Sequence, residues 1–99
     1  MKEFSSVVNS IISRISLYYA KEDCIKERIL DKSNSLSFYR KLGLNRECDT
    51  EMDRIVALHN ELDEHCREWR NIAMDIAILP KEYRVIIYKH MVKKRTRQL

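Results

Sequence analysis

Apolar residues recur at alternating steps of four and three from Phe4 to Ile29. This spacing is typical of one helix face, whereas a strand would alternate at every second residue. Only Glu22 interrupts the stripe, and the polar residues 31–35 predict the end of the helix. We therefore expect a first helix over about residues 3–31. Its stripe comprises Phe4, Val8, Ile11, Ile15, Tyr18, Ile25 and Ile29.

Residues 32–48 are the most loop-like segment of the chain. A short helix is predicted over 36–42, with Gly43 as its left-handed C-terminal stop. Thr50 and Asp53 form a variant of the capping box that starts helices. Pro80 disfavours helical geometry in the residue before it, so a second long helix is predicted over about 50–79. Its apolar stripe is predicted to comprise Met52, Ile55, His59, Leu62, Cys66, Trp69, Ala73 and Ile76.

Pro80 can also open a helix, and a third one is predicted over about 80–95. Two long helices of similar length with a short linker predict an antiparallel hairpin. The expected fold is all-α, a single helical domain over 1–99 made of this hairpin and a short C-terminal helix. A lone hairpin leaves part of its apolar stripes uncovered, so a second copy and a dimeric helical bundle are expected. The expected core or dimer seam consists of Ile11, Ile15, Tyr18, His59, Leu62, Trp69 and Ile76.

The composition excludes several classes of protein. The chain is 44% hydrophobic and 34% charged, with one Gly and one Pro, which is unlike collagen, low-complexity disorder or a loop-rich disulfide scaffold. A single glycine cannot form the phosphate-binding loops of nucleotide enzymes, and no small-molecule substrate is expected. Residues 4–20 are too short and too rich in serine to span a bilayer. With three cysteines and no secretory signal, we expect a cytoplasmic protein.

Positive charge is concentrated at the C-terminal end. Residues 80–99 hold seven basic side chains against one acidic side chain, a net charge of +6, whereas the other 79 residues hold 12 basic and 14 acidic, a net charge of −2. Such an end suits an anionic partner, nucleic acid or an acidic protein. Cations that simply favour a solvated helix C-terminus are an equally good interpretation. The expected contact residues are Lys89, Lys93, Lys94, Arg95 and Arg97.

Residues 59–66 hold the one group of metal-ligand residue types in the sequence. His59 and His65 are six apart, on different faces of a helix, so the zinc motif with histidines four apart is absent. His65 and Cys66 are adjacent and point about 100° apart on a helix, which does not suit a nucleophile–base pair. We expect surface and seam roles for these side chains, no metal, no cofactor and no catalysis.

Three aromatic residues near the basic end could stack on nucleic-acid bases. Trp69 lies on the predicted stripe, so we expect it in the core. Tyr83 lies on the apolar face of the third helix, whereas Tyr88 lies beside that face and its role stays open.

The stretch Leu79-Pro80-Lys81-Glu82-Tyr83-Arg84-Val85-Ile86-Ile87-Tyr88-Lys89-His90-Met91 resembles the start of a sigma-factor region 4-like helix-turn-helix. The run from about Asp49 to Leu99 is similar to small phage-encoded transcriptional regulators of the ArpU-like type, from Gram-positive hosts, whereas residues 1–48 match only in being helical. The resemblance places Lys93, Lys94, Arg95 and Arg97 near the DNA backbone. It also implies a recognition helix after the basic step, and this sequence lacks one. By this resemblance, the chain is either a truncated regulator, or a regulator that keeps the part for assembly and has lost the part that reads the DNA sequence. No residue is assigned to contacts with bases.

Two functional hypotheses follow. The first is a phage-type transcriptional regulator that is non-enzymatic and associates with nucleic acid, in the cytoplasm of a bacterial host. The alternative is a small protein-binding inhibitor or adaptor that acts through its helical faces and its basic end, which would meet an acidic host protein. A homodimer is expected in either case.

Overall fold

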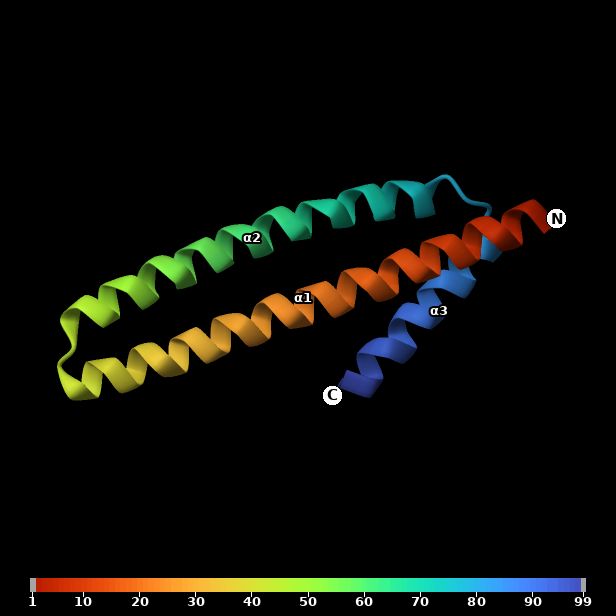
Figure 1. Ribbon diagram of the computed structural model, residues 1–99. Coiled ribbons are helices and arrows are strands. Elements are labelled where there is room, and N and C mark those ends of the chain that lie inside the picture. The colour runs from red at the N-terminus through yellow and green to blue at the C-terminus, as the bar shows by residue number, and fades with distance from the viewer. Residues whose placement is uncertain (1, 99) are drawn as a thin grey trace. The chain divides into compact units, whose positions relative to one another are not determined.

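The computed structural model describes the backbone of residues 2–98 and the side chains of residues 5–92. It contains three helices, α1 (Lys2–Leu42), α2 (Asn45–Ala77) and α3 (Lys81–Gln98) (Figure 1). The expected fold class is confirmed: the chain is all-α, with a long packed α1–α2 hairpin and a short C-terminal helix. The chain divides into two compact units, residues 1–19 with 68–99 (unit 1) and residues 20–67 (unit 2). Each unit is described by itself, and the expected single domain stays a prediction.

The first helix is longer than predicted, because α1 continues to Leu42 instead of ending at residue 31. The predicted loop over 32–48 and its separate short helix are therefore wrong. The polar residues 31–35 predict a turn, yet the Ser35 hydroxyl donates to the Asp31 carbonyl one turn back, at 3.2 Å. Such a bond lets serine sit inside a helix. The seam spacing also continues through this segment, with Lys32 half-buried and Leu36 buried.

Gly43 ends α1 as the sequence predicts. Its φ of 72° is left-handed, a conformation that glycine adopts without steric cost. The Gly43 N–H donates to the Arg40 carbonyl and the Leu44 N–H donates to the Tyr39 carbonyl, each at 3.1 Å. These two bonds form a Schellman motif, which satisfies carbonyls left over at a helix end. The turn therefore needs only Gly43 and Leu44, and α2 begins directly after them.

The predicted start of the second helix at Thr50 is also wrong, since α2 begins at Asn45. Thr50 does not cap the helix, because its hydroxyl donates to the Arg46 carbonyl at 3.1 Å, one turn back inside α2. The helix ends at Ala77, and α3 starts after Pro80. The Pro80 carbonyl accepts the backbone N–H groups of Tyr83 and Arg84, at 3.0 and 3.2 Å. Proline thus marks the break and also opens the third helix.

Unit 1 is built around an apolar core to which all three helices contribute. Ile15 and Ile87 are completely buried in it, so α1 and α3 share this core. Trp69 is half-buried, and the centroid of its ring lies 5.1 Å from the ring centroid of Tyr18 and 5.9 Å from that of Tyr19. Burial of large apolar side chains is the main source of stability in such a unit. The buried members are Val8, Ile11, Ile15, Tyr18, Tyr19, Ile72, Ile76, Leu79 and Ile87.

Unit 2 contains the α1 and α2 segments next to the Gly43 turn. Its buried apolar side chains are Ile25, Leu36 and Leu58, and it also buries Glu51 and His65. The seam of this unit is therefore mixed, with polar side chains at positions that aliphatic residues fill in unit 1.

The buried stripe of α2 differs from the predicted one at every second position. Residues 51, 58, 65 and 72 are buried, whereas the predicted members at 52, 59, 66 and 73 are exposed. The expected seam role of His59 is thus wrong, since its side chain is exposed and its neighbour Leu58 is buried. The prediction chose Met52 and Cys66 because they are apolar, and the hairpin instead buries their polar neighbours. The other expected seam residues lie inside: Ile11, Ile15, Tyr18 and Ile76 are buried, and Leu62 and Trp69 are half-buried.

Candidate nucleic-acid interface

The three helices differ strongly in charge. The helix α3 carries seven basic residues and one acidic residue, a net charge of +6. By contrast, α2 carries four basic and nine acidic residues, a net charge of −5, and α1 carries eight basic and five acidic, a net charge of +3. Positive charge is therefore densest on the shortest helix, and α3 is the surface most suited to an anionic partner.

One face of α3 anchors it in unit 1. Ile87 has no exposed surface, and Tyr83 and Met91 pack against the same core. These residues are four apart, so they lie along one side of the helix. The remaining sides of α3 are free to carry polar and charged residues.

The opposite side of α3 combines cations with apolar and aromatic side chains. Lys81 and Lys89 are exposed, and half of the Tyr88 side chain is exposed. Val85 and Ile86 are also exposed, by 40% and 50%. This mixture differs from an ordinary solvated helix face, on which large apolar side chains are few.

Of the five expected contact residues, Lys89 is the one with a described side chain, and it is exposed on α3. Lys93, Lys94, Arg95 and Arg97 belong to α3, but their side chains lie outside the described residues.

Arg84 was missed as a candidate contact residue. Its side chain is half-buried, and its Nε has no hydrogen-bond partner among the described residues. Lys81, Arg84 and Tyr88 are three and four apart, so they share one stripe of α3. The spacing was visible in the sequence, whereas the partial burial of Arg84 needed the structure.

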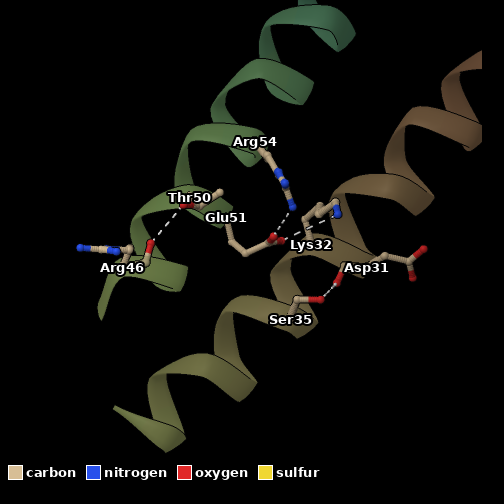
Figure 2. A network of polar contacts seen from close by, with 7 residues as sticks. All are labelled: Asp31, Lys32, Ser35, Arg46, Thr50, Glu51 and Arg54. Carbon is tan, nitrogen blue, oxygen red and sulfur yellow. Dashed lines mark hydrogen bonds and ion pairs between the residues drawn. The ribbon is translucent and has the colours of Figure 1, made fainter. Parts of the chain in front are cut away.

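A second polar cluster lies in unit 2, around the buried carboxylate of Glu51 (Figure 2). Glu51 is 4% exposed. Arg54 Nη1 donates to its Oε1 at 2.7 Å, and Lys32 Nζ lies 4.0 Å from its Oε2. Oε2 has no hydrogen-bond partner among the described side chains. The predicted pattern missed this cluster, because it placed Lys32 in a loop and chose Met52 instead of Glu51 for the apolar stripe.

A groove of about 470 Å³ lies beside this cluster in unit 2. Arg28, Lys32 and Arg54 line it together with the carboxylates of Asp31 and Glu61. Arg28 Nη1 lies 3.7 Å from Glu61 Oε1, so part of the positive charge is already paired. The groove is close to electrically balanced, and it does not select for an anion as α3 does.

The metal-ligand residue types of residues 59–66 do not come together in the structure. His59, Asp63, Glu64 and Cys66 are exposed on α2, whereas His65 is buried. Within the described residues, no three His, Cys, Asp or Glu side chains are placed to hold a metal ion. Over the same residues, no helix is both long enough and apolar enough to cross a bilayer.

Comparison of the chain with protein-family models, with curated protein sequences and with solved structures gives no match.

Proposed function

We propose that the protein is a non-enzymatic, nucleic-acid-associated regulator that binds its ligand through α3. The proposal depends mainly on one observation, the net charge of +6 on a helix of 18 residues whose Lys81 and Lys89 are exposed. The resemblance of residues 49–99 to phage-encoded transcriptional regulators supports the same function. A homodimer in the cytoplasm of a bacterial host belongs to this proposal.

Each phosphate that a Lys or Arg side chain neutralises releases a counterion, so binding through α3 must weaken as salt rises. The expected contacts are to phosphates, which position a protein on nucleic acid without reading its sequence. We therefore expect weak binding with little sequence preference.

Electrophoretic mobility shift with micromolar protein tests the proposal, at ~50 mM salt with duplex and single-stranded probes. Retardation that disappears at several times this salt concentration is expected. Lys89→Gln should weaken binding, whereas Lys41→Gln, which removes an exposed lysine of unit 2, should leave it unchanged. Absence of retardation of both probes at the lower salt concentration contradicts the proposal.

One observation favours the alternative of a protein-binding module. Unit 1 contains a groove of about 430 Å³ with Val7, Ile11 and Leu79 in its lining. The lining is mixed, since Ser6, Ser10, Arg14 and Asp75 also belong to it. Ile78, another lining residue, is 83% exposed, and an exposed apolar side chain among polar ones is a common feature of protein interfaces. A second copy of the chain or an acidic host protein could use this surface.

Capture experiments separate the two functions, whereas sedimentation tests the homodimer that both functions include. If the groove is an interface between copies, Ile78→Ser should shift the sedimenting species from dimer to monomer. If it binds a host protein, capture of that protein must survive nuclease treatment and must be lost with Ile78→Ser. A wild-type monomer that captures only proteins bridged by nucleic acid contradicts the alternative.

A further inference from the structure

Tyr88 differs in its surroundings from the other tyrosines of the chain. Tyr18 and Tyr19 are buried, and Tyr39 and Tyr83 are half-buried, whereas Tyr88 is 50% exposed. It lies on the most basic helix and outside the core that α3 helps to form. The tyrosine ring is thus presented to solvent next to a high density of positive charge.

The stripe of Lys81, Arg84 and Tyr88 combines two kinds of contact. Lys81 is seven residues before Tyr88, which places the two about 10 Å apart along the helix. Arg84 lies between them, one turn before Tyr88. Its side chain is half-buried, and its Nε is buried without a hydrogen-bond partner among the described residues. An exposed cation, Lys81, and a half-buried one, Arg84, therefore lie on the same side of α3 as the exposed ring.

This combination suits a single strand better than a duplex. A duplex stacks its base faces against each other and presents phosphates and base edges, which polar side chains read in the grooves. Single strands expose base faces, and proteins bind them with aromatic side chains beside a positively charged path. The exposed Val85, three residues before Tyr88 on the same side of α3, favours apolar base faces over hydrated phosphates.

We infer that Lys81, Arg84 and Tyr88 form a site for single-stranded nucleic acid, in which Tyr88 stacks on a base and the two cations contact flanking phosphates. The inference rests on the proposed nucleic-acid function and narrows its ligand from nucleic acid in general to unpaired strands.

Fluorescence anisotropy with the full chain tests this site, using a labelled oligothymidylate of about 15 nucleotides and a duplex of the same length. We expect the single strand to bind more tightly than the duplex. Tyr88→Ala should weaken single-strand binding about tenfold, since loss of one stacked base costs that order of affinity. Tyr88→Phe keeps the ring and should bind as the wild type does. Circular dichroism of each variant checks that the helices remain.

Two matched controls come from unit 2. Phe38→Ala removes an aromatic side chain that is 58% exposed, and it should leave the affinity unchanged. Lys81→Gln should lower the slope of log affinity against log salt by about 0.7, the value for one phosphate of a single strand. Lys41→Gln, which removes an exposed lysine of unit 2, should not change this slope.

The possible outcomes separate this inference from the proposed function. Tighter single-strand binding that is lost with Tyr88→Ala and kept with Tyr88→Phe supports it. Salt-dependent binding that favours the duplex, or equal effects of Tyr88→Ala and Phe38→Ala, overturns the stacking site and leaves the proposed function in place. Binding of neither probe overturns both.

Discussion

The two units of the molecule use the same helical seam in different ways. Among the described residues, unit 1 buries nine apolar side chains, whereas unit 2 buries three apolar side chains together with Glu51 and His65. Their charges differ as well. Unit 1 has ten basic and four acidic residues, a net charge of +6, and unit 2 has nine basic and eleven acidic, a net charge of −2.

This difference in burial predicts that one periodic pattern supports two levels of stability. An apolar core stabilises a unit in proportion to the area that it buries, whereas a buried carboxylate loses hydration that its partners replace only in part. We therefore expect unit 1 to be the more stable unit, and it is also the unit that holds α3. The basic helix is thus anchored in the better-packed part of the chain.

The largest effect is expected from truncation of the unit 1 core. Ile87→Ala should lower the free energy of unfolding by about 3 kcal/mol, because it opens a cavity under α3. Leu36→Ala in unit 2 should cost about 2 kcal/mol, since the sparser seam can relax around the gap. Urea denaturation measures both, with Leu17→Ala at an exposed position of unit 1 as the control. A larger loss of unfolding free energy for Leu36→Ala than for Ile87→Ala would contradict the expectation that unit 1 is the more stable unit.

Replacing the buried carboxylate of unit 2 should stabilise the protein. Glu51→Leu should raise the free energy of unfolding by about 1 kcal/mol, because an apolar side chain at this seam position has no desolvation cost. Glu64→Leu removes the same charge from an exposed position of α2 and should change stability by less than about 0.5 kcal/mol. Thermal unfolding compares the two. A loss of stability with Glu51→Leu would show that the contacts to Arg54 and Lys32 outweigh the desolvation.

A smaller loss is expected at the turn of unit 2. Gly43→Ala should destabilise the protein by about 1 kcal/mol, because an L residue at a φ of 72° is strained. The strain lies in the backbone, since an added Cβ would meet nothing within 4 Å. Gly43→Asn should lower the free energy of unfolding by less than Gly43→Ala does, since asparagine tolerates the left-handed conformation. Equal stability of the wild type and Gly43→Ala in urea denaturation would show that the helix can end differently.

The smallest effect is expected at the ion pair of unit 1. Arg14 Nη1 and Asp75 Oδ2 are 2.5 Å apart, but both side chains are more than a third exposed. Arg14→Gln should therefore cost about 0.5 kcal/mol at low salt and less as salt rises. Urea denaturation at two salt concentrations measures this. A cost well above 1 kcal/mol that persists at high salt would show that the pair is an essential part of unit 1.

Much of the fold was predictable because unit 1 follows simple rules. The apolar spacing around Ile11 and Ile15 and the break at Pro80 each have one local cause that the sequence displays, and so does the stop at Gly43 in unit 2. The prediction failed in unit 2, where packing overrides local preference. Residues 31–35 have the composition of a turn, and Glu51 and His65 occupy seam positions that apolar neighbours could have taken.

The candidate site was predictable in its charge and less so in its geometry. The basic character of residues 80–99 is visible in the composition. The exposure of Tyr88 and the partial burial of Arg84 depend on which face of α3 enters the core, and the sequence left the role of Tyr88 open.

Hydrogen exchange of individual backbone amides tests the difference between the two units most directly, because it reports the free energy of local opening at each residue. We expect amides beside the unit 1 core, such as those of Ile15, Ile72 and Ile87, to be the most protected in the chain. Amides near Ile25, Leu36 and Leu58 should open at a lower free energy. Protection in unit 2 that equals or exceeds that in unit 1 would contradict the view that its polar seam makes it the weaker unit.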